Sequence, residues 1–134
     1  MVAVGHKPVQ RRRAVAKGCL VCQPSTLAAL RGKALPKGDV LTVAQIAGIQ
    51  AAKRAADFIP LCHPLPLDHV EVGFQVEDDR IEITCSVGTS AKTGVEMEAL
   101  TGVSVAALTL YDMCKSEDKT MRIEGVRLFE KVKE

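Results

Sequence analysis

The sequence has few aromatic residues: no Trp, one Tyr and three Phe among 134 residues. Proteins that hold single-stranded nucleic acid stack the bases on aromatic side chains, so this composition argues against a nucleic-acid-binding module. The formal net charge of +2 is also too small to favour DNA or a membrane surface as a partner. The core must therefore be built mainly from Val, Leu, Ile and Ala.

Long apolar runs are also missing. No segment approaches the roughly 20 apolar residues of a membrane-spanning helix, and we find no signal peptide. The five cysteines are an odd number without the spacing of a disulfide framework, which favours a reducing compartment. We therefore expect a cytoplasmic protein with one domain over residues 1–134. The basic residues 1–13 are expected to form an extended or flexible arm.

Alternation of apolar and polar residues predicts a β-hairpin in the middle of the chain. The alternation runs over residues 70–76 and again over 81–87, with an acidic turn between them. Two further strands are expected, over residues 14–22 and over 121–132. The last strand is expected to break at Gly125.

Helix signals predict three helices. Pro24 begins a short one that ends near Gly32. The capping-box sequence that starts at Thr42 predicts a helix over 43–58, whose apolar face turns polar at its end. A second capping box opens a long, largely apolar helix within residues 92–115.

The predicted order is β-α-α-β-β-α-β. Without the short first helix it is the order of the ferredoxin-like fold, in the α+β class. The economical architecture is one antiparallel sheet with helices packed on one face. Its open face would suit oligomerisation.

Asp112 and Lys115 lie three residues apart and therefore share a helix face. A surface ion pair of little energetic value is the simplest interpretation. However, the preceding residues 103–110 are apolar on nearly every side, so the pair lies at the end of a buried helix. A lysine in partly apolar surroundings can act as an acid or base, and a neighbouring carboxylate can tune it.

Other charged residues lie near helix starts. Glu96 and Glu98 fall in the first turn of the long helix, where its dipole favours carboxylates. Capping accounts for Glu96 but less well for Glu98, and ionised carboxylates can also accept the N–H groups of a guanine-like edge. Lys37 lies in a Gly-containing loop before a helix, a suitable place for phosphate, although no P-loop pattern is present.

His63 lies in an apolar loop with three prolines. A lone histidine is more often structural, but such a rigid loop fixes where its side chain points. Cys19 and Cys22 have redox or zinc spacing, yet no second such pair exists, so we expect ordinary buried cysteines. His63 with His69 and Glu71 is an alternative metal site.

Two long stretches resemble one known family. Residues 37–67 and 92–115 carry the motifs PLCHPL, GVEMEALT and LYDMCK in the order and approximate spacing of the MoaC family, the cyclic pyranopterin monophosphate synthases of molybdenum cofactor biosynthesis. The resemblance covers essentially the whole chain. It implies a ferredoxin-like fold and a homohexamer, a trimer of dimers with active sites at subunit interfaces.

The resemblance also implies a reaction. The substrate is (8S)-3',8-cyclo-7,8-dihydroguanosine 5'-triphosphate, made from GTP by a radical S-adenosylmethionine GTP cyclase. The product is cyclic pyranopterin monophosphate, and pyrophosphate is released. The resemblance implies no certain cofactor, although Mg²⁺ can accompany the triphosphate.

Functional residues carry over by position in the matching motifs. The catalytic group falls on Asp112, Lys115 and Lys37, with Lys115 expected to be the principal acid/base and Asp112 to tune it or activate water. Three of these positions, Lys37, Arg12 and Lys131, carry the positive charge that a triphosphate needs. The substrate contacts fall on Leu61, Cys62, His63, Glu96, Met97, Glu98, Arg12 and Lys131.

The chain departs from the family pattern near its ends. The family usually opens with Met-Val-Asp-Val, whereas Ala3 replaces the Asp, so we expect no role for an arm carboxylate. Family members often carry a Gly-rich basic tail after the position of Glu134, and its absence is expected to lower activity if that tail covers the triphosphate. Two alternatives remain: a non-catalytic hexameric scaffold that binds a purine nucleotide, and a metal-dependent hydrolase.

Overall fold

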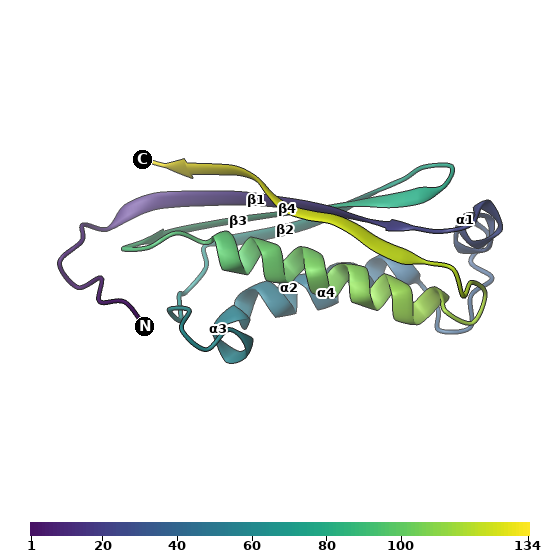
Figure 1. Cartoon of the computed structure of the whole chain (residues 1–134), viewed down its shortest axis with the longest axis horizontal. Helices are drawn as coiled ribbons and strands as arrows, with labels where there is room; N and C mark the ends of the chain where they lie inside the picture. The colour runs from purple at the N-terminus through teal and green to yellow at the C-terminus, as the bar shows by residue number, and fades with distance from the viewer.

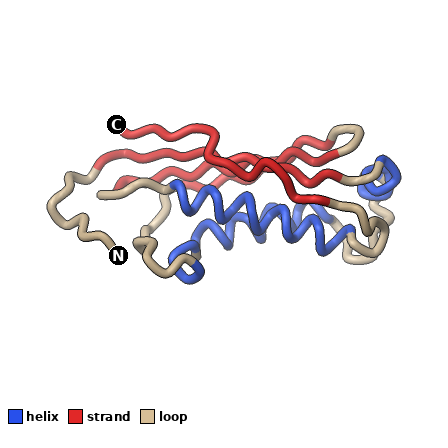
Figure 2. The backbone as a smooth tube through the Cα atoms, viewed as in Figure 1, coloured by secondary structure: helices blue, strands red, loops and turns tan.

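Four strands form one antiparallel sheet in the order β2-β3-β1-β4, with helices on one face (Figures 1 and 2). The structure, a computed structural model, describes residues 1–134. The elements are β1 (Gln10–Val21), α1 (Pro24–Arg31), α2 (Val40–Lys53), α3 (Ala55–Phe58), β2 (His69–Val76), β3 (Arg80–Ala91), α4 (Glu96–Cys114) and β4 (Arg122–Lys133).

This topology confirms the α+β, ferredoxin-like prediction. The interior strand β1 pairs with β3 on one side and β4 on the other. The predicted hairpin is β2 and β3, and every second residue of β3 from Ile81 to Val87 is fully buried. Strand β4 changes register where Gly125 adopts a φ of 64°, so the expected break is present.

Several predicted boundaries were wrong. Strand β1 begins at Gln10, so residues 10–13 belong to the sheet; Gln10 pairs with Ala91, and this pairing also lengthens β3. Helix α2 is capped by Asp39, not Thr42: the Asp39 carboxylate accepts the Thr42 N–H at 3.2 Å. An aspartate is as good an N-cap as a threonine, and here it precedes the threonine.

Two further helix predictions were wrong: one missed a break within the helix, and the other placed the helix start too early. The predicted helix over 43–58 is interrupted at Arg54, whose ψ of 19° is not helical, and resumes as α3. Helix α4 begins at Glu96, after Val95, and Thr93 supplies no side-chain cap. Residues 92–94 instead turn the chain from the end of β3 towards α4.

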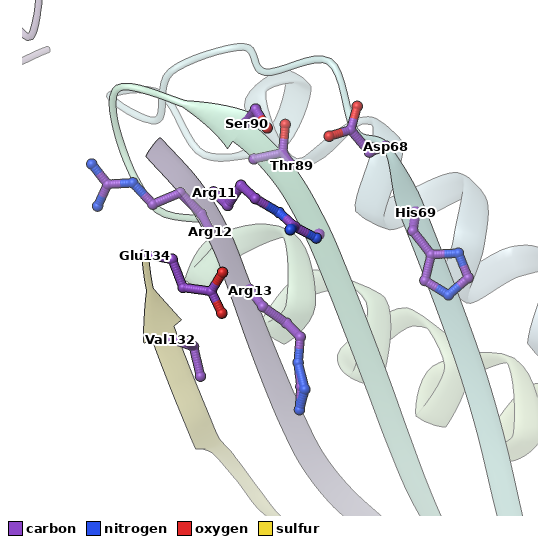
Figure 3. A pocket seen from close by; sticks show the side chains of 10 residues that line it. Arg11, Arg12, Arg13, Asp68, His69, Thr89, Ser90, Val132 and Glu134 are labelled. Atoms are coloured by element: carbon purple, nitrogen blue, oxygen red, sulfur yellow. The ribbon is translucent and has the colours of Figure 1, made fainter. Parts of the chain in front are cut away.

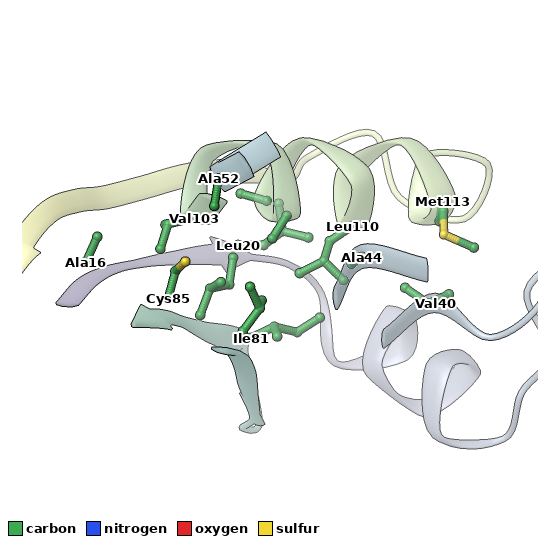
Figure 4. Close-up of a cluster of buried hydrophobic side chains, with 14 of the residues drawn as sticks. Ala16, Leu20, Val40, Ala44, Ala52, Ile81, Cys85, Val103, Leu110 and Met113 are labelled. Atoms are coloured by element: carbon green, nitrogen blue, oxygen red, sulfur yellow. The ribbon is translucent and has the colours of Figure 1, made fainter. Parts of the chain in front are cut away.

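The core lies between the sheet and the paired helices α2 and α4. Leu20, Ile81 and Leu110 are fully buried there (Figure 4). The two helices approach closely at two glycines: a Cβ on Gly48 would lie 3.0 Å from the Gly102 carbonyl oxygen, and a Cβ on Gly102 would lie 2.6 Å from the Cys85 sulfur. The small residues in α2 and α4 therefore set how closely the helix layer approaches the sheet.

The five cysteines are unpaired, and Cys19 and Cys22 are buried as expected. None of the helices combines the length and apolarity needed to span a bilayer.

Candidate active site

The predicted site residues gather at the two ends of α4, which runs beneath the sheet (Figure 1). Glu98 lies in its first turn and Asp112 in its last. These positions are separated by about 21 Å along the axis, at 1.5 Å per residue. A single chain therefore presents two separate clusters rather than one closed site.

At the C-terminal end of α4, Asp112 binds two lysines. Lys37 donates to Oδ2 at 2.6 Å, and Lys115 donates to Oδ1 at 3.0 Å. These two hydrogen bonds lower the pKa of Asp112 below its ordinary value. All three side chains are about half exposed, so the network is accessible to a ligand. The sequence-predicted catalytic group thus lies together.

Local structure explains how Lys37 reaches this network from a loop 75 residues earlier. Leu35 anchors the loop in the core with 5% of its surface exposed. Gly38 adopts a φ of 96°, which turns the chain into the start of α2. Lys37 lies between these two points, and its Nζ reaches the Asp112 carboxylate.

At the N-terminal end of α4, Glu98 has the opposite environment. Only 3% of the residue is exposed, and its Oε1 has no hydrogen-bond partner. Its Oε2 contacts the Cys62 thiol at 3.7 Å. Burial raises the pKa of Glu98 above its ordinary value, despite the thiol's opposing effect. An unpartnered buried oxygen is costly, so this group is suited to a ligand that donates hydrogen bonds.

The remaining predicted contacts surround Glu98. Glu96 forms a long ion pair with Lys131, 3.8 Å between Oε2 and Nζ. Leu61 and Met97 are exposed apolar side chains at the same end. Residues from two separate sequence motifs therefore lie at the same end of α4. The side chains of Leu61 and Met97 make no polar contact.

The N-terminal arm crosses this end of the molecule. The His63 ring nitrogen Nε2 lies 2.7 Å from the Val2 carbonyl oxygen, and Lys92 donates to the Gly5 carbonyl at 3.2 Å. The Arg12 guanidinium donates to the carbonyls of Ala91 and Lys92 rather than to a carboxylate. No carboxylate therefore pairs with the Arg12 guanidinium.

Sequence reasoning missed part of the surface next to Glu98. A cavity of about 330 Å³ adjoins it and is lined by Lys53 and Arg54 at the end of α2, by Asp57 in α3 and by Pro64. The available signal was the polar end of the α2 face, where Lys53 and Asp57 follow apolar residues at helical spacing. The interruption at Arg54 then turns these residues around the cavity.

Comparison with known proteins gives the family. The model of the MoaC family matches residues 1–133. The chain belongs to the MoaC family. It is 55% identical over 133 residues to a protein of Chloroflexus aggregans named cyclic pyranopterin monophosphate synthase, covering 98% of this chain and 81% of the relative. A protein of Pyrococcus furiosus, named probable cyclic pyranopterin monophosphate synthase, is 51% identical over 141 residues, covering 100% and 90%.

A further relative carries the MoaC-like region inside a longer chain. The molybdenum cofactor biosynthesis bifunctional protein of Chlorobaculum tepidum is 56% identical over 128 residues. The match covers 96% of this chain and 41% of the relative.

A second cavity of this MoaC-family chain, about 350 Å³, lies over the open sheet face (Figure 3). Arg11 and Arg13 of β1 contribute to it with His69 of β2. Arg13 is already paired with Glu130 at 3.2 Å. Alternation along the strand directs Arg12 to the other face, towards the arm. The arginine run therefore divides between the two faces.

The alternative metal site does not assemble. His69 contacts Glu71 at 3.5 Å, whereas His63 contacts the arm. No three His, Cys, Asp or Glu side chains form a group that could hold a metal ion.

Proposed function

We propose that this chain converts (8S)-3',8-cyclo-7,8-dihydroguanosine 5'-triphosphate to cyclic pyranopterin monophosphate, with release of pyrophosphate, as a step of molybdenum cofactor biosynthesis. The observation that carries the proposal is the Lys37–Asp112–Lys115 network in a chain of the MoaC family. Relatives matched over nearly the whole chain bear the name of this synthase.

The network suits the proton transfers that the purine rearrangement needs. Asp112 stays ionised and holds two ammonium groups in place before substrate arrives. We assign Lys115 the role of principal acid/base, with Asp112 orienting it and Lys37 completing the charge balance. Because Lys115 and Lys37 share one carboxylate, loss of a proton from either leaves the other still paired.

The phosphate chemistry needs positioning and positive charge. A ribose hydroxyl attacks the phosphorus nearest the sugar, the bond from that phosphorus to the departing pyrophosphate breaks, and the hydroxyl proton passes to a base. Lys37, Arg12 and Lys131 are the cations proposed to stabilise the leaving pyrophosphate. Any Mg²⁺ would enter with the triphosphate.

Glu98 is proposed to bind the base. Its free Oε1 and the adjoining cavity offer an acceptor in a desolvated place, which suits the N–H edge of a guanine-derived ring. Cys62, His63, Glu96, Met97 and Leu61 surround it as further contacts.

The separation of the two clusters supports an interface site. We propose a homohexamer, a trimer of dimers, in which the Asp112 end of one chain meets the Glu98 end of a neighbour. A radical S-adenosylmethionine GTP cyclase is the proposed source of the substrate. Neither nucleic acid nor membrane is a proposed partner.

Pyrophosphate release from the cyclised dihydro-GTP tests the activity. Lys115→Ala and Asp112→Asn should each lower kcat by about 10²–10⁴-fold, the usual worth of acid/base catalysis. The matched control is Asp79→Asn, an exposed aspartate whose side chain has a single partner, Arg80. Activity that survives in both active-site variants would move the chemistry elsewhere. A folded parent that binds nucleotide without releasing pyrophosphate would favour the scaffold alternative.

Mixing inactive chains tests the interface. Lys115→Ala and Glu98→Ala chains, co-refolded in equal amounts, should regain about one quarter of parental activity if each site combines two chains. Sites built within one chain would regain none.

A further inference from the structure

Asp118 is a buried carboxylate close to the Asp112 network but separate from it. It lies three residues after Lys115 and only 2% of it is exposed. It makes no salt bridge and accepts four hydrogen bonds from neutral donors. Oδ2 accepts from the Gln23 N–H and the Thr26 hydroxyl, both at 2.9 Å. Oδ1 accepts from the Thr120 N–H at 2.8 Å and the Thr120 hydroxyl at 2.6 Å.

One side of this network is the start of α1. Gln23 is the N-cap of that helix but provides no side-chain cap, and the first turn contains no acidic residue. Asp118, 95 residues away, supplies the missing acceptor and the negative charge that the helix dipole favours. Thr26 adds a hydroxyl that is itself 1% exposed.

From α1 the connection continues to Lys37. The Lys33 N–H donates to the Leu30 carbonyl at 3.1 Å and the Ala34 N–H donates to the Ala29 carbonyl at 2.9 Å, so the loop after α1 is bound to that helix. Leu35 then anchors it in the core. A displacement of α1 would therefore carry the Lys37 loop with it.

The other side of the network is the segment that follows α4. The Glu117 N–H donates to the Cys114 carbonyl at 3.0 Å, and Lys119 donates to the Lys115 carbonyl at 2.7 Å. These bonds extend the end of the helix as far as Asp118. The carboxylate thus joins the two elements that carry Lys37 and the Asp112–Lys115 face.

We propose that Asp118 is a positioning residue for the reaction: by binding the start of α1 and Thr120 at once, it sets the position of Lys37 relative to Asp112. Apolar packing of Leu27 and Leu110 also holds these elements together, but it has no preferred direction. Four hydrogen bonds to one carboxylate fix orientation as well as distance. The expected effect on catalysis rests on the proposed function. The expected effect on the position of Lys37 relative to Asp112 does not.

The test replaces the carboxylate by its amide. In Asp118→Asn one acceptor oxygen becomes an NH₂ group that faces two donors, so at least one side of the network is lost with little change of shape. Thr26→Val removes a single donor at similar volume and provides a milder variant should Asp118→Asn fold poorly. Thr109→Val is the control, because that hydroxyl bonds only within α4, to the Val105 carbonyl.

The first readout needs no activity: the titration of the Asp112 carboxyl followed by ¹³C NMR. Release of Lys37 should move the pKa of Asp112 towards its ordinary value in Asp118→Asn, by less in Thr26→Val and not at all in Thr109→Val. Unchanged titration in folded Asp118→Asn would overturn the proposal. This result is independent of whether the parent chain turns over the proposed substrate.

The second readout is a double-mutant cycle on kcat for pyrophosphate release, at a temperature where every variant is folded. Asp118→Asn should lower kcat by about 10-fold or more, with a smaller change in KM. The same substitution should have little further effect in a Lys37→Ala chain. An equal loss in both backgrounds would mean that Asp118 affects kcat independently of Lys37 and would overturn the proposal. No release by the parent would count against the proposed function alone.

Discussion

The carboxylates at the two ends of α4 have opposite environments and opposite pKa shifts. Asp112 is half exposed and binds two ammonium groups, and its pKa is lowered. Glu98 is buried with one oxygen unpartnered, and its pKa is raised. The helix dipole alone favours the reverse, because it stabilises negative charge at the N-terminus and opposes it at the C-terminus.

Local contacts therefore outweigh the dipole at both ends. Two hydrogen bonds from lysines exceed its adverse effect on Asp112, and loss of water exceeds its favourable effect on Glu98. One end is preorganised before any ligand binds. The other retains unused hydrogen-bonding capacity that a ligand or a neighbouring chain can complete.

Removing the cation that comes from outside α4 should have the largest effect on this contrast. In Lys37→Met the pKa of Asp112 should rise, and kcat should fall by about 10²–10³-fold, within the range for a group that supports acid/base chemistry. Stability should change little, because the ion pair is exposed. NMR titration, steady-state kinetics and urea unfolding measure the three quantities. A loss of stability that accounts for the lost activity would contradict the assignment.

Crowding the middle of α4, which carries both clusters, should have the next largest effect. In Gly102→Ala the new methyl group would lie 2.6 Å from the Cys85 sulfur in β3, so the Cys85 side chain or α4 must move. We expect a loss of about 1–3 kcal/mol in the free energy of unfolding, as for other overpacked cores. Urea unfolding measures it. Gly73→Ala is the control, since nothing lies within 4 Å of its added Cβ. Equal effects of the two substitutions would refute close packing as the cause.

Neutralising the buried end should have the smallest overall effect of the three changes, but the sign of its effect on stability is the most informative. Because the pKa of Glu98 is raised by folding, the folded state binds the proton more tightly than the unfolded state. Its contribution is most favourable at or below the ordinary carboxyl pKa and is lost as pH rises through the raised value. Glu98→Gln lacks this loss and should be the more stable chain at pH 8, by about 1 kcal/mol.

The difference between parent and Glu98→Gln should shrink as the pH falls towards 4, which unfolding curves at several pH values would reveal. A Glu98→Gln chain that is less stable at every pH would mean that Oε1 has a hydrogen-bond partner. Weaker substrate binding by the stable variant would support the proposed role of Glu98.

The sequence predicted the elements better than their ends. Alternation identified the β2–β3 hairpin because one face of an antiparallel sheet is buried. The cap at Asp39 and the interruption at Arg54 were missed because capping patterns recur at adjacent positions, and the chain's other contacts decide between them. The strand start at Gln10 was missed because it depends on pairing with Ala91, far away in the sequence.

For the site too, the sequence identified the residues but not their long-range contacts. The motifs brought out Asp112, Lys115, Glu98 and His63 by type and position. No pattern in the sequence could show that Lys37 binds Asp112, or that Glu98 has a free oxygen, because both depend on distant segments. The bonds that Gln23 and Thr26 donate to Asp118 were equally hidden, because these partners lie 95 and 92 residues earlier in the chain.

The position of β4 has a consequence for synthesis of the protein. Its partner β1 is an interior strand and leaves the ribosome first, whereas β4 leaves after every other element. Until then, a nascent chain whose β1 has paired with β3 exposes the other edge of β1 along its whole length, and open edges recruit strands from other chains. The sheet is therefore vulnerable to misassembly late in translation, after α4 has been synthesised. This vulnerability ends only when β4 pairs with β1.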